Sequence, residues 1–321
     1  GILEFVETSA KTGENVAEAY GRVAGLRDVP LYIDLQGAKL RVHGAQPQCS
    51  VAAGERVALV CLAADATDAP APAAASDATK TIFVGPNIMG LLRAGAEVGI
   101  DDAKVELVVE AVAGDGTRAE AVVRRGGVVR ARKGFNLRPH PVTHTALCER
   151  DRAHVAATRG HSFVRYALSF ACLPSEVEEL RAVAGADRVL AVKLERPLDT
   201  AAAVALGTSA GELWVCRGDL GAQLGTAGAL AVYYRHFVAD TLPLLLKAHC
   251  RVVMAGEVLD HMCGAPVPTR SEVCHLADLW ADGFDAIVVS NETAFGKFPQ
   301  NALAVFRDVA DALAKEFPRT C

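Results

Sequence analysis

The 321-residue sequence lacks the features of membrane proteins and of nucleic-acid-binding proteins. It contains no apolar run of roughly 18 residues, the length that a membrane-spanning helix needs, and no signal peptide is recognisable. Acidic residues (38) outnumber lysines and arginines (33), so no basic excess is present to attract nucleic acid or an anionic membrane. We therefore expect a globular protein with no nucleic-acid partner and no membrane insertion.

The cysteines also lack the spacing of a metal site. The nine are scattered singly along the chain, and no C-x-x-C pair, which is typical of zinc ribbons and thioredoxin-like motifs, occurs. Several lie in apolar segments, as small buried side chains do. Unpaired thiols of this kind predict a reducing intracellular compartment, and we expect the cytoplasm.

Two kinds of apolar pattern follow each other along the chain. Between Ala38 and Leu137, short alternating runs such as ERVALVCL and KVELVVEAV predict a small all-β domain, with a low-complexity loop at residues 64–79. After Leu137, runs such as RVLAVKLE and RVVMAGEVL alternate with helical patterns, and a further helix is expected from Thr12. The sequence predicts an α/β fold, a TIM-type (β/α)8 barrel interrupted by the β domain as a lid.

Two of the expected helices begin with the residues of a capping box. Ser175 and Glu178 have the required spacing in PSEVEEL, and Thr269 and Glu272 have it in PTRSEV. The second helix is expected to end at Gly283, because glycine is favoured just after the last helical turn.

Charged residues follow two of the apolar runs. Lys193 and Glu195 end one run, and Arg217 and Asp219 follow the next. Alternation along a strand points Lys193 and Glu195 to the same side. Two carboxylates and an ammonium suit a divalent cation and an anionic substrate, and the turn at Gly218 offers backbone N–H groups to an anion. A structural ion-pair cluster is the alternative interpretation, and for Arg217 a pairing with a nearby carboxylate stands beside a role in substrate binding.

Taken in order, these motifs resemble those of the pyruvate kinase family. The matching segments are IDLQGAKLR, KGFNL, VKLE, CRGDLG and VPTRSEVCHLADLWADGFDAIVVSNETAFGKFP, and the resemblance covers nearly the whole chain. It implies a barrel (A) domain of residues 1–37 and 138–321 and a mobile lid (B) domain of residues 38–137. It also implies that the family's first barrel strand and carboxy-terminal regulatory domain are absent here, so that the barrel is incomplete at its N-terminus.

The resemblance assigns roles to the residues at the strand ends. Glu195 and Asp219 would hold Mg²⁺, and Lys193 would stabilise the enolate and the transferring phosphoryl group. The backbone amides of Gly218 and Asp219 would receive the substrate carboxylate. Ser9 is retained from the family's substrate-binding segment.

The resemblance also assigns residues near the lid. Arg41 and Lys133 would face the nucleotide phosphates, with Arg41 near the substrate as well; ordinary solvated lid charges are the alternative interpretation. Leu35, Gln36 and Lys39 are similar to the K⁺-independent branch of the family, in which a lysine ammonium replaces the monovalent cation. We therefore expect a requirement for Mg²⁺ but not for K⁺.

Four positions depart from the family pattern. Phe5 replaces a phosphate-contacting arginine, Glu7 replaces an asparagine and Ala10 replaces a histidine. Gly256 stands where a threonine hydroxyl serves proton transfer. Losing one positioned proton donor lowers a rate by roughly 10²–10⁴, and losing a cationic phosphate clamp adds a comparable factor. The replacements predict slow turnover.

Three functions are compatible with this pattern. The first is the family reaction of glycolysis, Mg²⁺-dependent phosphoryl transfer from phosphoenolpyruvate to ADP giving pyruvate and ATP. The second is a pseudoenzyme that serves as a structural or assembly subunit of a larger complex, in which a partner covers the edges of the incomplete barrel. The third is a metabolite-binding regulator. His249, His261 and His275 show no ligand spacing and are expected to be ordinary surface or core residues.

Overall fold

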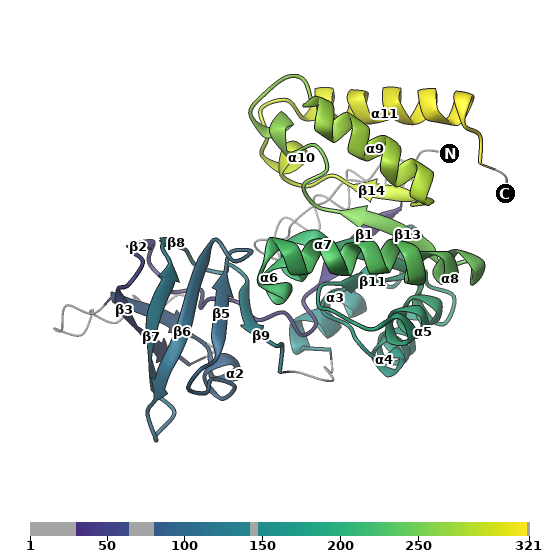
Figure 1. Ribbon diagram of the computed structural model, residues 1–321. Coiled ribbons are helices and arrows are strands. Elements are labelled where there is room, and N and C mark those ends of the chain that lie inside the picture. Colours follow the sequence, from purple (N-terminus) through teal and green to yellow (C-terminus); the bar gives the residue numbers. More distant parts are fainter. Residues whose placement is uncertain (1–29, 64–79, 142–146, 320–321) are drawn as a thin grey trace. The chain divides into compact units, whose positions relative to one another are not determined.

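The computed structural model (Figure 1) describes residues 30–63, 80–141 and 147–319. Within these residues the chain divides into two compact units. The first unit comprises residues 30–37, 147–217 and 233–319, and the second comprises residues 38–141 and 218–232.

The first unit is built on a parallel β-sheet. Its strand order is β1-β10-β11-β12-β13-β14, and every neighbouring pair is parallel. Strands that are covered on both faces are near-continuous apolar runs, and β11 is buried at every position. The strands are β1 Leu31–Leu35, β10 Val164–Leu168, β11 Leu190–Leu194, β12 Gly211–Cys216, β13 Arg251–Ala255 and β14 Ala286–Val288.

This sheet is curled, so that side chains from non-adjacent strands meet on its inner face. The ring centroids of Tyr32 on β1 and Trp214 on β12 lie 5.1 Å apart, although β10 and β11 separate the two strands. Residues such as Ala167, Ala191 and Val253 pack with Trp214 in this inner layer. The six parallel strands of the described residues form a half-barrel, which confirms the predicted α/β fold of TIM type.

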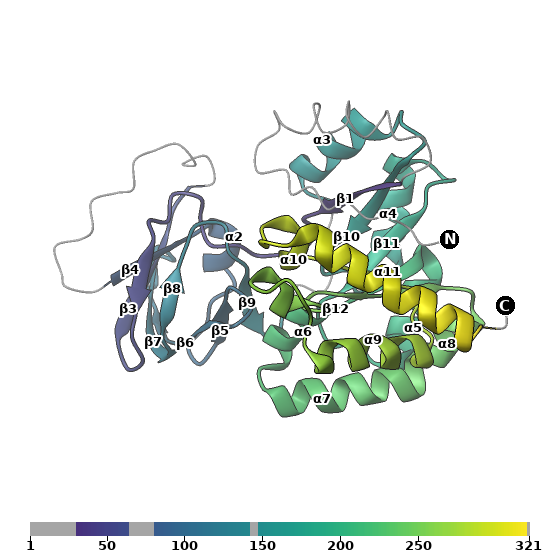
Figure 2. The same cartoon turned by 90° about the horizontal axis from the view of Figure 1, so that it is seen from above.

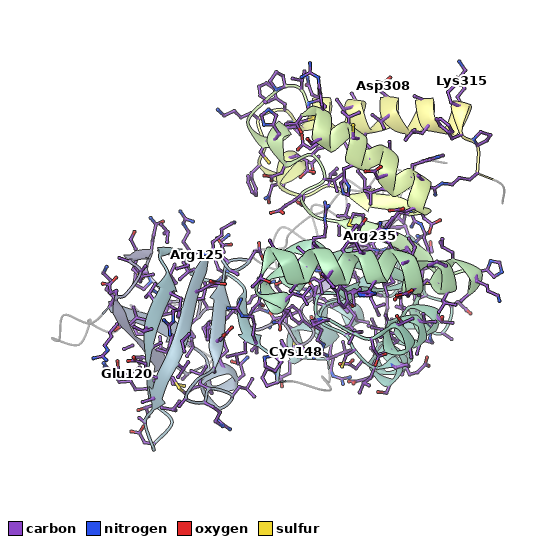
Figure 3. All side chains as sticks on the ribbon, viewed as in Figure 1. Glu120, Arg125, Cys148, Arg235, Asp308 and Lys315 are labelled. Carbon is purple, nitrogen blue, oxygen red and sulfur yellow. The ribbon has the colours of Figure 1, made fainter. Side chains whose placement is uncertain are left out.

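Helices of the first unit pack against the sheet and against one another. α4 and α5 lie side by side (Figure 1), as do α9 and α11 (Figure 2). Asp308 and Lys315 project from the exposed side of α11 (Figure 3). The helices that follow the lid segment are α3 Glu149–Thr158, α4 Pro174–Ala184, α5 Thr200–Ala210, α6 Arg217–Leu224, α7 Ala227–His236, the π-helical turn η1 Phe237–Thr241, α8 Leu242–Lys247, the 3₁₀ turn η2 Asp260–Cys263, α9 Arg270–Asp282, α10 Asn291–Ala294 and α11 Pro299–Glu316.

The capping box predicted for α9 is confirmed. The Glu272 backbone N–H donates to the Thr269 hydroxyl at 3.2 Å, and the Thr269 N–H donates to the Glu272 carboxylate at 2.7 Å. The helix ends at Gly283, whose φ of 102° lies in the region that favours glycine.

The capping box predicted for Ser175 and Glu178 is wrong. α4 begins at Pro174, two residues before the start that a Ser175 cap requires, because the fixed φ of proline suits the first helical position. At the start of the helix, the Glu176 carboxylate accepts hydrogen bonds from the backbone N–H groups of Cys172, at 2.7 Å, and Leu173, at 2.8 Å. Glu178 lies instead 3.7 Å from Arg181.

The second unit is mainly β, as predicted for the lid. A six-stranded sheet of order β4-β3-β7-β6-β5-β9 is antiparallel except between β3 and β4, and β2 pairs with β8 (Figure 1). Apolar side chains from these strands form one core. The elements are β2 Cys49–Val51, β3 Arg56–Cys61, β4 Lys80–Val84, the short helix α2 Pro86–Met89, β5 Glu97–Ile100, β6 Val105–Val112, β7 Arg118–Arg125, β8 Gly127–Val129 and β9 Phe135–Arg138.

Most of α6 belongs to this second unit, although the helix directly follows strand β12. Arg138 at the end of β9 donates from Nη1 to the carbonyl of Ala222 at 3.3 Å. A cation near the last carbonyls of a helix is favourable, because these carbonyls form the negative end of the helix dipole.

Some predictions fall on residues that the structure does not describe. They are the helix from Thr12, the loop at residues 64–79, the retained Ser9 and the replacements Phe5, Glu7 and Ala10. These predictions are not tested.

Candidate functional site

Lys193 lies in strand β11 and is the centre of a polar cluster in the first unit. Its Nζ donates to both oxygens of Asp34, at 2.9 and 3.1 Å, and to the Ser169 hydroxyl at 3.3 Å. Ser169 also donates to Asp34 at 3.1 Å. Asp34 is in β1 and Ser169 directly follows β10, so neighbouring parallel strands bring these polar side chains together at one level of the sheet.

Glu195, the residue after β11, joins the same cluster. Its Oε1 lies 3.2 Å from Lys193 Nζ, which confirms that the two side chains point to the same side. Its Oε2 accepts the backbone N–H of Phe170 at 2.8 Å. Phe170 adopts a φ of 57°, a conformation that costs a non-glycine residue about 1–2 kcal/mol. The strain directs this backbone N–H at the carboxylate and fixes the position of Glu195.

The cluster keeps the Lys193 ammonium charged. Burial alone lowers the pKa of this group, but the carboxylates of Asp34 and Glu195 outweigh burial and hold the pKa well above its ordinary value. The Lys193 and Glu195 side chains are 10% and 1% exposed, so the positive charge is presented from a fixed, shielded position. Such a charge can stabilise negative charge that develops on a substrate.

Asp219 lies in the first turn of α6, in the second unit. Its Oδ2 is 2.5 Å from Lys39 Nζ, and its Oδ1 accepts from Asn136 Nδ2 at 3.3 Å. The structure therefore brings together two of the residues that the sequence singled out, Lys39 and Asp219. Strand β12 ends at Cys216, so Arg217 and Asp219 begin the helix and do not extend the strand.

Within residues 30–63, 80–141 and 147–319, Arg217 forms no ion pair with a carboxylate, so the pairing that was one of its two interpretations is not found there. Its Nε and Nη2 donate to the carbonyl of Gly256 at 3.1 and 2.5 Å, and its Nη1 lies 2.8 Å from His275 Nε2. Arginine can only donate, so His275 accepts and is neutral in this arrangement. Burial, and then the charge of Arg217, lower the pKa of His275. The hydrogen bonds of Arg217 therefore connect the end of β12 to the end of β13.

Gly256 occupies the position that the resemblance assigns to proton transfer. Its φ is 84°, and a Cβ added there would meet no atom within 4 Å. The backbone conformation, and not crowding, is what favours glycine at this position.

Arg41 and Lys133 lie in the second unit, where Arg41 forms an isolated bridge with Gly134. Arg41 Nη1 donates to the Arg132 carbonyl at 3.1 Å, and Lys133 Nζ is 3.0 Å from Asp101. Both side chains retain exposure to solvent. Gly218 begins the second unit's part of α6, and a Cβ added there would lie 3.5 Å from the Asp102 carboxyl carbon.

The donors of Glu195 and Asp219 suit a hard divalent cation, which prefers carboxylate oxygens. One oxygen of Asp219 lies 2.5 Å from the ammonium of Lys39. Among residues 30–63, 80–141 and 147–319, no group of three or more His, Cys, Asp or Glu side chains is arranged around a common point.

The sequence reasoning missed Asp34, Ser169, Phe170 and Asn136. Asp34 and Ser169 carry the same signal as Lys193, a polar residue at or just after the end of an apolar parallel strand. Phe170 carries no such signal, because it contributes through a backbone N–H in an unusual conformation.

Comparison with known proteins agrees with the motifs. The family model described as pyruvate kinase, barrel domain, matches residues 5–303. This chain belongs to the pyruvate kinase family. The match includes β1 and the strands from β10 to β14, and also the β-strands of the second unit inserted between them.

Relatives from several bacteria show the same family signal. The pyruvate kinase of Methylorubrum extorquens is 31% identical over 296 residues, which are 90% of this chain and 57% of the relative. That of Mycobacterium tuberculosis is 32% identical over 295 residues, 89% of this chain and 57% of the relative. That of Geobacillus stearothermophilus is 27% identical over 310 residues, 92% of this chain and 48% of the relative. The chain spans about half the length of the curated pyruvate kinases that it matches.

Two further findings concern the predicted class of protein. No helix of the part of the chain that the structure describes is long and apolar enough to cross a membrane.

The eight cysteines among the described residues are all free thiols. Cys216 and Cys250 are buried, whereas Cys274 is exposed. The prediction that several cysteines are small buried side chains is thus confirmed for Cys216 and Cys250.

Proposed function

We propose that this chain catalyses the family reaction, Mg²⁺-dependent phosphoryl transfer from phosphoenolpyruvate to ADP, at a reduced rate. The observation that carries the proposal is the buried Lys193 ammonium in contact with Glu195 and Asp34. An ammonium fixed in a shielded place needs no reorganisation when negative charge develops on the substrate, and phosphoryl transfer depends mainly on such positioning and charge neutralisation.

In this proposal Lys193 stabilises the enolate and the transferring phosphoryl group. Ser169 and Asp34 hold the Lys193 amine in place, and the Phe170 backbone N–H orients Glu195. The backbone N–H groups of Gly218 and Asp219 bind the substrate carboxylate at the positive end of α6.

Glu195 and Asp219 would hold the Mg²⁺ ion. When bound, the ion neutralises phosphoryl and carboxylate oxygens and orients the substrate. Support comes from the oxygen donors of both residues and from their order in the family motifs VKLE and CRGDLG. Arg41 and Lys133 would bind the nucleotide phosphates, with Arg41 near the substrate as well. Ser9 would contact the substrate, and Lys39 would make K⁺ unnecessary.

The test is an assay of pyruvate formation from phosphoenolpyruvate, ADP and Mg²⁺ with the purified chain. Variants Asp219→Ala and Lys193→Met serve as controls, because each removes one proposed part of the site. We expect slow turnover that both variants abolish and that added K⁺ does not raise. The proposal is wrong if the unsubstituted chain forms pyruvate no faster than Asp219→Ala does.

A second candidate is a metabolite-binding protein without chemistry, and Gly256 favours it. Glycine has no hydroxyl to donate a proton at the end of β13, so binding groups could persist where the proton donor is lost. Calorimetry with oxalate, an enolate mimic, and Mg²⁺ separates the two candidates. Oxalate binding in a chain that shows no turnover supports this second function.

A further inference from the structure

Lys39 and Asp219 form a short, shielded ion pair within the second unit. Lys39 Nζ lies 2.5 Å from Asp219 Oδ2, and the two side chains are 14% and 8% exposed. Asn136 Nδ2 donates to the other oxygen, Oδ1, at 3.3 Å. Both oxygens of the carboxylate therefore have a donor, and one of these donors carries a full positive charge.

The surroundings of the pair are acidic. Burial raises the pKa of Asp102, the charge of Asp219 raises it further, and the charge of Lys39 opposes the rise. Lys39 therefore lies within electrostatic reach of two carboxylates. Gly134 passes beside the pair, since a Cβ added there would lie 3.7 Å from Asp219 Oδ1 and 3.8 Å from Lys39 Cε.

We propose that the Lys39 ammonium competes with the divalent cation for Asp219 and leaves Oδ2 when the ion binds. The inference rests on the proposed function, because it takes Asp219 as a metal ligand. Mg²⁺ holds its oxygen ligands at about 2.1 Å in a strict octahedral arrangement. An ammonium bound to the same oxygen occupies a position from which the ion would approach that oxygen. The positive charges of the ammonium and of the ion also repel each other.

This role differs from that of a monovalent-cation substitute. A residue that only replaces K⁺ acts alongside the bound divalent ion and does not have to leave Asp219. A competitor lowers the affinity for the ion and neutralises Asp219 until the ion arrives. The shielded carboxylate then never lacks a counter-charge, which would be costly. Lys39 thus sets the Mg²⁺ concentration at which the site fills.

The first test is calorimetric titration of the full chain with Mg²⁺ alone. Lys39→Met removes the charge and keeps most of the side-chain stem, and Asp219→Asn removes the proposed ligand. Lys104→Met is the matched control. Lys104 also lowers the pKa of Asp102, but its Nζ contacts Asp101 at 3.7 Å, and its side chain is 66% exposed. Lys104→Met therefore removes a positive charge from the same part of the second unit without changing the contact between Lys39 and Asp219.

We expect Lys39→Met to bind Mg²⁺ at least about tenfold more tightly than the wild type, since one competing positive charge is removed. Lys104→Met should match the wild type, and Lys39→Met combined with Asp219→Asn should lose the gain. The proposed competition is wrong if Lys39→Met leaves the affinity for Mg²⁺ unchanged or lowers it, while Asp219→Asn lowers it. That result leaves the proposed function standing. Absence of Mg²⁺ binding in both the wild type and Lys39→Met overturns both.

A second measurement uses the unsubstituted chain and does not depend on how the variant folds. Acylation of lysine amines is followed by mass spectrometry with and without saturating Mg²⁺. Release from Asp219 should make Lys39 react several-fold faster, while the rate at Lys104 stays constant. Equal reactivity of Lys39 in both conditions, with Mg²⁺ binding demonstrated in the same sample, overturns the proposal.

Discussion

Tyr32 donates its phenol hydrogen to Oε2 of Glu212 at 2.8 Å, across two intervening strands of the parallel sheet. The same Glu212 carboxylate accepts from Trp214 at 2.5 Å and from Arg251 at 3.1 Å, and Arg165 donates to the Tyr32 oxygen at 2.9 Å. Glu212 is 2% exposed, so a polar network replaces apolar packing at the amino-terminal end of the inner layer. The network links β1, β10, β12 and β13.

We expect the Tyr32 phenol to make the stability of the chain fall at alkaline pH. Burial, and then the charge of Glu212, raise the pKa of Tyr32 from 10.0 to about 12. The folded state holds the phenol proton more tightly than the unfolded state, so this contribution is complete below pH 10 and is lost as the pH rises towards about 12. The free-energy difference between the wild type and Tyr32→Phe, measured by urea unfolding, should shrink over this window. A difference that stays constant with pH would show that the phenol proton does not contribute.

His275 should act in the opposite direction, at acid pH. Its pKa lies below the ordinary value of 6.5, because burial and the charge of Arg217 disfavour the imidazolium, while Asp278 and Asp282 oppose this shift. The unfolded state binds the proton more readily, so stability is lost as the pH falls below 6.5. His275→Asn does not titrate and keeps an acceptor for Arg217. Between pH 7.5 and pH 5, the wild type should therefore lose more stability than this variant. Parallel pH profiles would contradict the prediction.

Restoring a threonine at position 256 should destabilise the fold. Gly256 has a φ of 84°, which costs a residue with a side chain about 1–2 kcal/mol, although an added Cβ meets no neighbour within 4 Å. Gly264 provides a matched control, because it is equally open but has a φ of -115°. Gly256→Thr should lower the free energy of unfolding by that amount, and Gly264→Thr should lower it less. Equal losses would show that backbone conformation is not the cause.

A glycine at position 249 should stabilise the protein. His249 follows α8 with a φ of 56°, donates its N–H to the Leu246 carbonyl at 3.0 Å and is exposed, so its side chain contributes little at this helix end. Glycine adopts this conformation without strain, so His249→Gly should raise the free energy of unfolding by up to about 1 kcal/mol. Lys247→Gly, at the last residue of α8, should lower it by up to a similar amount. Thermal unfolding of the two variants should shift in opposite directions, and a loss of stability in His249→Gly would refute the argument.

Several site residues were predictable because their signal is local. Lys193 and Glu195 end a buried apolar run, and strand alternation alone requires them to share a side. The cap of α9 follows from Thr269 and Glu272, three residues apart. The cap of α4 was misplaced, because Pro174 and Glu176 satisfy the helix start two residues earlier than Ser175 and Glu178 would.

Partners that are distant in sequence were not predictable in the same way. Arg217 contacts Gly256 and His275, which are 39 and 58 residues further along the chain. Lys39 contacts Asp219 across 180 residues. Such pairs depend on which strands become neighbours and on where the chain re-enters each unit, and neither is encoded in the residues around the site.

The sequence by itself determined the alternation of strands and helices, the β insertion and the family, because apolar periodicity and ordered motifs depend only on neighbouring residues. Tertiary structure alone decided which partner each charged side chain has. Curling of the sheet brings Tyr32 to Glu212 across two strands, and backbone strain at Phe170 directs an N–H group to Glu195. Both are consequences of long-range packing, which places groups by the geometry of the whole sheet and not by their spacing along the chain.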